Sequence, residues 1–369
     1  MRIGIDVRCL IEPHHSGVAY YTKNLLEHLF AVDTKNTYLL FYNSYRPVKN
    51  TVLEEYKKFS HVSLHSYSWP NKFFNFSQKY FKRPLIDKLL GGVDIFFAPN
   101  LQFLALSSDC KKVSTAHDLS FEIYPEFLSL KRKFWHKVIN PRKFFSSSDA
   151  IIAVSKNTKK DLINIYNIPE DKINVIYSGV ETQLIASVPN ETQPKYILTI
   201  STLEPRKNIE SLITAFKRLI KNEQYKDYQL FIVGSKGWKS KSIYKSAANE
   251  NSIKFLGYVS EEKKQELYMN AQAFVFPSFY EGFGFPPLQA LKYNVPVIAA
   301  QTSSLPEILG PAALYVNPYD SAELSRALQS VLQNNSLREN LINAGKTQAN
   351  NFSWEKSARD TLAVFNSLV

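Results

Sequence analysis

The sequence predicts an α/β protein made of two Rossmann-like domains, each with a parallel sheet. Short apolar runs alternate with helical patterns from the first residues to about residue 180, which is typical of parallel strands joined by helices. The alternation restarts at Tyr196, after a polar stretch, residues 181–194, that holds two prolines and reads as a linker. At 369 residues the chain is also longer than one hydrophobic core usually organises.

In the first half, the expected strands are short apolar runs that end at polar or glycine-containing loops. These runs are residues 1–7, 38–42, 62–64, 94–98, 112–116, 150–155 and 172–177. A loop with glycine, residues 13–19, is expected after the first run. An amphipathic helix is expected after this loop, because Tyr21, Leu25 and Leu29 recur at helical spacing. Ser155 ends the sixth run, where its side chain is expected to cap the following helix.

The second half repeats the pattern. Its expected strands are residues 196–200, 229–233, 252–256, 271–276, 295–300 and 312–316. Its expected helices are residues 209–216, 260–268, 286–291, 320–332, 336–350 and 354–368. Ser260 suits an N-cap, and Pro286 and Pro287 suit a first helical turn, where proline loses no needed hydrogen bond.

The composition indicates a globular protein, with 44% hydrophobic and 14% aromatic residues. No run of about eighteen apolar residues predicts a membrane-spanning helix, and Asp6 interrupts any signal-peptide pattern at the start. Cys9 and Cys110 adjoin strand-like runs and are expected to be reduced core residues of a cytosolic protein. No residues have metal-ligand spacing, so we expect no metal cofactor.

The formal net charge of +12 favours an anionic partner, such as nucleic acid, an anionic membrane or a phosphorylated ligand. No nucleic-acid-binding signature accompanies this charge, so we expect no nucleic-acid partner. Residues 71–90 and 131–145 interleave aromatic with basic side chains, as interfacial helices on an anionic bilayer do. The alternative is a pair of helices packed on the sheet with solvated basic faces. Because both segments lie in the same half, we favour membrane contact.

A glycine loop joins the strand expected at 271–276 to the helix after Pro286, and Glu281 lies within it. Glycines let backbone N–H groups approach a ligand, and the helix N-terminus favours an anion by about 0.3–1 kcal/mol. A carboxylate at such a site is unfavourable unless it binds sugar hydroxyls or faces a developing positive charge. The alternative is a tight turn with a solvated glutamate.

Two further loops carry candidate chemistry. Arg206 and Lys207 follow the strand at 196–200, where a guanidinium fork and a mobile ammonium suit a pyrophosphate leaving group. His117 and Asp118 end the strand at 112–116, where the imidazole could bind a sugar hydroxyl or a backbone carbonyl. Each has an alternative. Arg206 and Lys207 could be ordinary surface charges, His117 could have a structural role, and Asp118 could cap the next turn. A serine hydrolase is excluded, since the chain has no G-x-S-x-G elbow.

Pro277 to Ala290 resembles the signature of glycosyltransferase family 4, a P-S-x-x-E-G-F-G-x-P-P loop with a second glutamate eight residues after the first. The likeness extends over nearly the whole chain, including residues 17–20, 114–119, 203–208, 296–299 and 303–307. Gln289 stands where the family has its second glutamate, and Ser201 where it often has glycine. An amide cannot make charge-assisted hydrogen bonds, so we expect Gln289 to affect donor affinity or choice.

The resemblance implies a GT-B fold. It implies an acceptor-binding domain over residues 1–182, a nucleotide-sugar-binding domain over 195–352, and a helix, 353–369, that packs back on the first domain. It also implies retaining transfer of a hexose from a nucleotide-diphosphate sugar to an acceptor hydroxyl, without a metal. The combination of His117 and Asp118 with residues 303–307 is most similar to mannosyl- or rhamnosyltransferases of bacterial surface polysaccharides, and GDP-mannose is the first donor expected.

The resemblance assigns roles residue by residue. Glu281 would position the donor sugar and face positive charge at the anomeric carbon, while Arg206 and Lys207 would hold the diphosphate. His117 would act near the reacting carbon and Asp118 on the acceptor side. The remaining donor-binding residues implied are Gly17, Val18, Gly234, Tyr258, Val259, Gly282, Phe283, Gly284, Phe285 and Gln289.

The acceptor implied is a glycan or lipid-linked glycan, handled at the cytoplasmic face of the plasma membrane. Two alternatives remain open. One is a GT-B epimerase of UDP-sugars, which would release UDP without an acceptor. The other is a catalytically weak scaffold or sugar-binding protein, which Gln289 favours.

Overall fold

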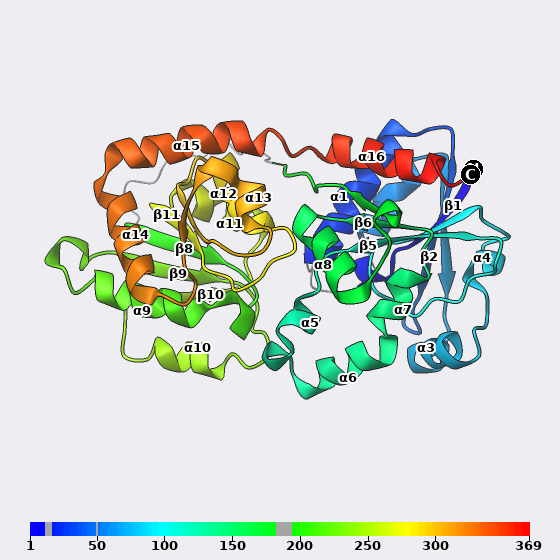
Figure 1. Cartoon of the computed structure of the whole chain (residues 1–369), viewed down its shortest axis with the longest axis horizontal. Helices are drawn as coiled ribbons and strands as arrows, with labels where there is room; N and C mark the ends of the chain where they lie inside the picture. The colour runs from blue at the N-terminus through cyan, green and yellow to red at the C-terminus, as the bar shows by residue number, and fades with distance from the viewer. Residues whose placement is uncertain (12–16, 49–50, 182–193) are drawn as a thin grey trace. The chain divides into compact units, whose positions relative to one another are not determined.

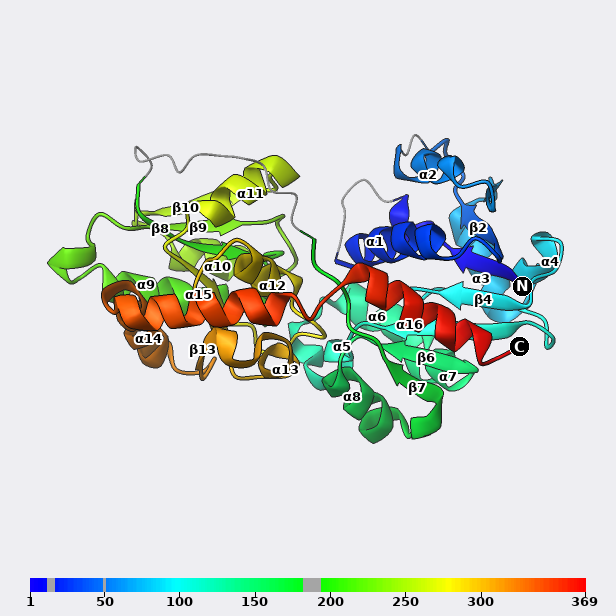
Figure 2. The same cartoon turned by 90° about the horizontal axis from the view of Figure 1, so that it is seen from above.

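The computed structural model describes residues 1–11, 17–48, 51–181 and 194–369. These residues form two compact units (Figures 1 and 2). The first unit comprises Met1–Leu119, Lys131–Gly179 and Ser353–Val369, and the second comprises Ser120–Leu130 and Val180–Phe352. Most of the expected linker, and residues 13–16 of the first loop, lie outside the described residues.

Within the described residues, the first unit contains a seven-stranded parallel sheet in the order β3-β2-β1-β4-β5-β6-β7. The strands are β1 Arg2–Asp6, β2 Thr37–Asn43, β3 Val62–Tyr67, β4 Ile95–Ala98, β5 Lys111–Ala116, β6 Ala150–Ala153 and β7 Ile173–Val175. The chain starts in the middle of the sheet, where Ile3 pairs with Tyr38 on one side and Ile95 on the other. The predicted α/β class and strand positions of this half are confirmed.

Helices cover both faces of this sheet. They are α1 Gly17–Val32, α2 Thr51–Glu55, α3 Asn71–Tyr80, α4 Ile86–Leu89, α6 Leu130–Ile139, α7 Pro141–Ser146, α8 Lys156–Tyr166 and α16 Trp354–Asn366. The predicted cap of α8 is confirmed, since the Ser155 side chain accepts from the Thr158 amide. One prediction is wrong, because Gly17 and Val18 lie in the first turn of α1 and not in a loop. The apolar period of α1 continues to its start, with Ala19 buried one turn before Thr22.

The last helix, α16, packs beside α1 in the first unit (Figure 2). Trp354 at its start is buried and makes edge contacts with the rings of Tyr20 and Tyr21. Gly179 lies against this helix start, and a Cβ at position 179 would be 2.2 Å from the Trp354 nitrogen. Residue 179 must therefore be glycine, because any side chain there would clash with the backbone of Trp354.

In the described part of the second unit, the sheet has six parallel strands in the order β10-β9-β8-β11-β12-β13. The strands are β8 Tyr196–Ile200, β9 Gln229–Val233, β10 Ile253–Gly257, β11 Ala273–Phe276, β12 Val297–Ala300 and β13 Ala313–Val316. The helices are α5 Ser120–Ile123, α9 Ile209–Leu219, α10 Lys241–Ser246, α11 Glu261–Met269, α12 Phe285–Lys292, α13 Leu305–Leu309, α14 Ser321–Gln333 and α15 Asn335–Ala349. The sequence did not predict α5, α10 or α13, which are one to two turns long. Too few residues establish a period over that length.

Short 3-10 helices complete the connections. They are η1 Arg8–Leu10, η2 Tyr56–Lys58, η3 Pro125–Phe127, η4 Glu170–Lys172, η5 Pro205–Lys207, η6 Glu223–Tyr225 and η7 Gly310–Ala312. Among the described residues, no helix is long and apolar enough to cross a membrane. Cys9 and Cys110 are both buried and are not joined by a disulfide.

The unit boundary differs from the domains expected from the sequence. It falls between Gly179 and Val180, and residues 120–130 belong to the second unit. The Phe127 ring stacks on Phe279, with ring centroids 5.4 Å apart, and the Trp238 indole donates to the Phe127 carbonyl at 2.7 Å. Sequence patterns divide a chain into consecutive stretches, so they do not show a short segment that packs with a partner far along the chain.

A lysine is buried at the edge of the first unit's core. The Lys112 ammonium, on β5, donates to the Phe144 carbonyl at 2.5 Å and to the Ser147 hydroxyl at 3.1 Å. It also lies 3.6 Å from the centroid of the Phe144 ring. Burial, reinforced by the charge of Lys82, lowers the pKa of Lys112 to about 7. The folded state therefore binds this proton less tightly than the unfolded state.

This lysine makes stability depend on pH. Because an unfolded lysine has a pKa of about 10.4, the unfolded chain binds more protons between pH 7 and that value, and Lys112 makes stability rise with pH there. We expect Lys112→Met to remove most of this rise, measured as the free energy of unfolding in urea at pH 7 and pH 9.5. Lys111→Met, at the exposed neighbouring position, is the control and should keep the wild-type slope. Equal slopes in all three proteins would contradict the assignment.

Candidate active site

The candidate site lies in the second unit, at the carboxyl edge of its sheet. Three loops meet there, residues 201–208 after β8, residues 277–284 after β11, and residues 301–304 after β12. Strands β8, β11 and β12 are neighbours in the sheet, so the loops that follow them lie next to one another. In open α/β sheets this edge is where ligands bind.

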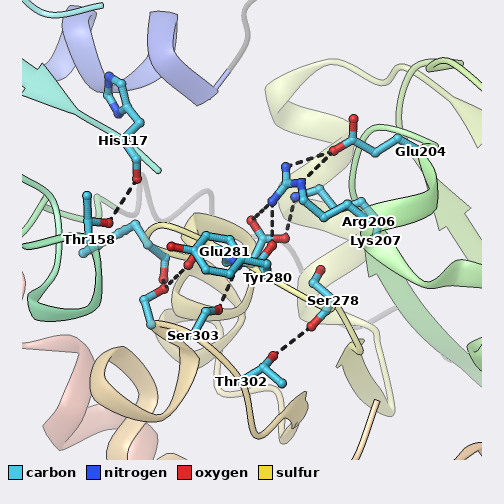
Figure 3. Close-up of polar contacts among 12 residues, drawn as sticks. His117, Thr158, Glu204, Arg206, Lys207, Ser278, Tyr280, Glu281, Thr302 and Ser303 are labelled. Atoms are coloured by element: carbon cyan, nitrogen blue, oxygen red, sulfur yellow. Dashed lines mark hydrogen bonds and ion pairs between the residues drawn. The ribbon is translucent and has the colours of Figure 1, made fainter. Parts of the chain in front are cut away.

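A buried carboxylate bridged by two cations forms the centre of this edge (Figure 3). Glu281 is 7% exposed. The Lys207 ammonium lies 2.6 Å from one of its carboxylate oxygens, and Nη1 of Arg206 lies 3.1 Å from the other. The structure thus brings together the three residues that the sequence singles out in two separate loops.

A second acid, Glu204, holds the guanidinium in place. Its Oε1 lies 3.1 Å from Nε and 2.9 Å from Nη2 of Arg206, and its side chain is buried. Nη1 of Arg206 also donates to the Tyr280 carbonyl at 2.6 Å, so the guanidinium orientation is set on two sides. Sequence reasoning missed this role. The only signal was the place of Glu204 two residues before Arg206 in the same loop.

Glu281 is ionised at neutral pH. Burial by itself would raise the pKa of its carboxyl group, but the charges of Lys207 and then Arg206 oppose it and hold that pKa below its usual value. Lys207 and Arg206 balance Glu281 and Glu204 in charge. A diphosphate that entered this site would compete with the two carboxylates for the cations. Displacement of the cations from Glu281 would leave its carboxylate facing the group bonded to the diphosphate.

Two serines after β12 hold the backbone of Glu281. Its N–H donates to the Ser303 hydroxyl at 2.8 Å, and its carbonyl accepts from the Ser304 hydroxyl at 2.9 Å. Ser304 also lies 3.2 Å from the Phe283 carbonyl, which it can reach as a second acceptor. Ser303 has a φ of +51°, a left-handed conformation that is uncommon outside glycine and asparagine. The sequence placed both serines in a motif but assigned them no role.

We expect Ser304→Ala to disturb the site as well as the fold. Ser304 is fully buried, and losing its hydroxyl removes the one donor that the Glu281 and Phe283 carbonyls share, which costs roughly 1–3 kcal/mol of stability. For a domain of this size the melting temperature should fall about 2–4 °C for each kcal/mol. The control is Thr302→Val, which removes a hydroxyl that donates to the Ser278 carbonyl at 3.0 Å rather than to the backbone of Glu281. The transfer activity expected from the resemblance should fall further in Ser304→Ala than in the control, and equal activities would contradict a positioning role.

The glycine loop itself is tightly packed. Gly284 has a φ of +103° and caps α12, and a Cβ there would lie 2.9 Å from Leu305. The Phe283 ring is buried and contacts the rings of Phe285 and Phe352, so it belongs to the unit's core. Gly282 is buried between Glu281 and Phe283. The loop therefore presents backbone rather than side chains, as a close-approach loop requires.

Gln289 lies in α12 and is buried, with only 8% of its surface exposed. The Tyr268 hydroxyl donates to the Pro286 carbonyl at 3.0 Å and lies 3.5 Å from Oε1 of Gln289. The amide thus faces a hydroxyl inside the second unit. A charged glutamate at this position would need stronger partners than a neutral amide does.

The other expected donor residues of this unit follow β9 and β10. Gly234 has a φ of +139°, and a Cβ there would lie 1.9 Å from the Ser201 carbonyl. Glycine is therefore required at 234 for the ends of β8 and β9 to meet, whatever it does toward a ligand. Tyr258 is exposed and Val259 half-buried just after β10, the outer strand of the sheet.

The expected acceptor-side residues lie in the first unit. Nε2 of His117, just after β5, is 2.8 Å from the Pro99 carbonyl. A carbonyl can only accept, so Nε2 carries the proton and Nδ1 is left as the acceptor nitrogen of the neutral ring. Burial lowers the pKa of His117, although the bond to Pro99 and the charge of Asp118 oppose this shift. The Tyr21 ring meets the imidazole edge-on, with centroids 4.8 Å apart.

The structure therefore separates the predicted residues into two groups. Glu281, Arg206 and Lys207 share one cluster in the second unit, together with the loop of residues 282–285. His117, Asp118, Gly17 and Val18 lie in the first unit. Across the described residues, no group of three or more His, Cys, Asp or Glu side chains is placed to hold a metal ion.

Family models match both halves of the chain. Residues 15–184 match Glycosyltransferase Family 4, and residues 180–348 match Glycosyl transferases group 1. The O-antigen chain mannosyltransferase B of Escherichia coli is 34% identical over 272 residues, which covers 70% of this chain and 71% of that protein. The O-antigen chain mannosyltransferase RfbU of Salmonella typhimurium is 30% identical over 224 residues, which covers 59% of this chain and 60% of that protein.

Solved structures share the fold over the whole chain. Sucrose-phosphate synthase from Thermosynechococcus elongatus matches with a TM-score of 0.76 and 18% identity, covering 100% of this chain and 98% of that one. Anabaena Alr3699/HepE in complex with UDP-glucose matches with a TM-score of 0.73 and 16% identity, covering 100% of both chains. The expected GT-B fold is confirmed. From these matches, the chain belongs to the group 1 and family 4 glycosyltransferases.

Proposed function

We propose that this glycosyltransferase transfers mannose from a nucleotide-diphosphate sugar to a hydroxyl of a glycan or lipid-linked acceptor, with retention of configuration. The observation that carries the proposal is the ionised Glu281 carboxylate, which Lys207 and Arg206 bridge in the loop that precedes α12. The names of the O-antigen mannosyltransferases among its relatives support mannose, and GDP-mannose is the donor we test first.

The cations would stabilise the leaving group. As the bond between C1 of the sugar and the diphosphate oxygen breaks, negative charge grows on that oxygen and positive charge on C1. Arg206 would bind the developing negative charge with little reorganisation, because Glu204 and the Tyr280 carbonyl already hold its guanidinium, and Lys207 would add a second positive charge. We propose that Arg206 and Lys207 stabilise the diphosphate leaving group without a metal ion.

Glu281 would face the positive charge at C1 and bind the donor sugar. Retaining glycosidases instead use a second carboxylate as a covalent nucleophile, about 5–5.5 Å from the acid. The nearby Glu204 is 2% exposed and engaged by Arg206, so it does not fit that role. On the acceptor side, the neutral His117 would offer Nδ1 to a sugar hydroxyl, while Pro99 holds its other nitrogen.

A thermal-shift panel with GDP, UDP, ADP, TDP and their sugar conjugates tests the donor. A ligand at about one hundred times its dissociation constant stabilises a protein by roughly 2.7 kcal/mol. We expect GDP and GDP-mannose to raise the melting temperature, and a lipid-linked glycan then to accept mannose. If no nucleotide shifts the melting temperature, the scaffold alternative replaces this proposal. UDP release without an acceptor would favour the epimerase alternative.

The proposed acceptor places the reaction at the cytoplasmic face of the plasma membrane. A lipid-linked glycan stays in the bilayer, so an enzyme that elongates it gains from binding the same surface. The basic charge of the chain suits anionic lipids. The surface that would meet the bilayer belongs to the first unit.

A further inference from the structure

The first unit has a cavity of about 630 Å³ beneath α3, within the roughly 300–1,000 Å³ of small-molecule sites. Its walls are mostly apolar and include Trp69, Phe73, Phe74, Leu85 and Leu89. Nothing in the proposed transfer reaction uses this cavity, because the candidate site residues of the first unit follow β5 or begin α1.

The inner side of α3 is firmly held. The Phe74 ring is buried and packs on Trp69, with centroids 5.4 Å apart, and on Phe41 at 6.0 Å. The buried Gln78 side chain donates to the Pro84 carbonyl at 2.7 Å and accepts from the Ala105 amide at 2.7 Å. The helix is therefore a fixed wall of the cavity, and its outer side is free to meet a partner.

The outer side of α3 exposes large aromatic rings. Phe73 is 65% exposed, and three residues later on α3 the exposed Phe76 ring contacts the exposed rings of Tyr80 and Phe81, with centroids 4.7 and 5.8 Å away. An isolated exposed ring is common, but a contiguous apolar group of this kind marks an interaction site. Phe73 belongs both to this surface and to the cavity wall, so the apolar surface leads into the cavity.

The charges around the cavity are positive. Arg83 and Lys88 line it, and both side chains are exposed. Lys72 and Lys82 are exposed on the same segment. Its one acid, Asp87, is buried, accepts from the amide and hydroxyl of Ser107, and lies 3.9 Å from the Lys88 ammonium, so the exposed charges of the segment are all positive. An apolar cavity with a basic rim complements a hydrocarbon chain attached to an anionic head group.

The second basic aromatic segment lies on the same side of the unit. Figure 1 shows α3 and α6 along its lower edge, and Phe134 and Trp135 of α6 are exposed. We propose that this edge binds an anionic phospholipid bilayer and that the cavity takes one acyl chain of a phospholipid whose phosphate meets the basic rim. The inference deepens the membrane partner of the proposed function and rests on it, but it concerns only the first unit.

Vesicle flotation tests the surface. The full chain is mixed with vesicles of phosphatidylcholine alone or of equal parts phosphatidylcholine and phosphatidylglycerol. We expect binding to the anionic vesicles only. Each basic residue near such a surface contributes about fivefold to the partition coefficient, so Lys72→Gln with Lys88→Gln should weaken binding on the order of 25-fold. The charge-matched control, Lys241→Gln with Lys245→Gln on α10, should bind like wild type.

Fluorescence quenching tests the cavity. Phosphatidylglycerol with brominated acyl chains should quench tryptophan emission in the wild type, and Trp69→Phe should lose part of that quenching while still binding vesicles. The paired change Phe73→Ser with Phe76→Ser, at exposed positions, should weaken vesicle binding with an unchanged melting temperature. Equal quenching in wild type and Trp69→Phe, or equal binding to both vesicle types, would overturn the proposal.

Transfer is measured separately with a water-soluble glycan acceptor. A protein that transfers mannose but does not bind vesicles would overturn the lipid site and leave the proposed function standing. A protein that binds anionic vesicles but transfers nothing would overturn the proposed function and leave the lipid site standing.

Discussion

Replacement of Glu281 by glutamine is expected to lower kcat about 100-fold or more, the loss typical of removing one preorganised electrostatic stabiliser. Glutamine keeps the size of the side chain and can still accept from Lys207. It removes the negative charge that would face the anomeric carbon, which matters only in the transition state. The fold should persist, since the backbone of residue 281 is held by Ser303 and Ser304 and not by its side chain.

The same change should not weaken nucleotide binding. In the wild type a diphosphate competes with Glu281 for Lys207 and Arg206, and the neutral amide competes less. GDP affinity, measured by calorimetry, should therefore stay equal or rise while kcat falls. Glu204→Gln is the comparison, because it removes a charge from Arg206 without removing the group proposed to face the sugar. A Glu281→Gln protein with wild-type turnover would place the catalytic carboxylate elsewhere.

Replacement of Lys207 by alanine is expected to impair both the leaving group and Glu281. It removes a cation proposed for the diphosphate, so kcat/KM should fall on the order of 100- to 1,000-fold. It also removes the largest charge that lowers the pKa of Glu281, and burial then raises that pKa. Since Glu281 must be ionised, the acid limb of the pH–rate profile should move to higher pH in the variant.

The pH profile separates this role from a purely structural one. Lys207→Arg keeps a positive charge beside Glu281, so it should restore the position of the acid limb even where it restores only part of the rate. The profile of residual kcat/KM between about pH 4 and pH 8 is the measurement, a window around the ordinary glutamate pKa. An acid limb at the same pH in wild type and Lys207→Ala would show that Lys207 does not control the ionisation of Glu281.

Much of the fold follows from local pattern. The apolar runs at 94–98 and 150–155 became β4 and β6, and Ser155 and Ser260 cap α8 and α11 as expected. Hydrophobic periodicity reports which side of a segment is buried, so it locates strands and long helices reliably. This periodicity misplaced Gly17. A glycine that follows a polar stretch is typical of a loop, although here it begins the helix α1.

The candidate site was less predictable. The loops with Glu281 and with Arg206 and Lys207 were recognisable, since glycine, proline and adjacent cations are informative over short distances. Three other features were not recognisable from the sequence. They are the contact of Glu204 with Arg206, the contacts of Ser303 and Ser304 with Glu281, and the stacking of Phe127 on Phe279. The serine and phenylalanine contacts join residues far apart in the chain, and no local pattern records which segments become neighbours. The contact of Glu204 with Arg206 lies within one loop, but it depends on how that loop folds.

The sequence by itself determined the alternation of strands and helices, the two parallel sheets and the loops that carry charge. The alternation and the charged loops are set within short segments, and parallel sheets follow from the alternation, because parallel strands are joined by long connections such as helices. Only the tertiary structure decided that residues 120–130 join the second unit and that α3 and α6 share one edge of the first. It also decided that a buried glutamate stays ionised between two cations. The physical reason is the strand order, which places residues far apart in the chain within hydrogen-bonding distance and removes them from water together.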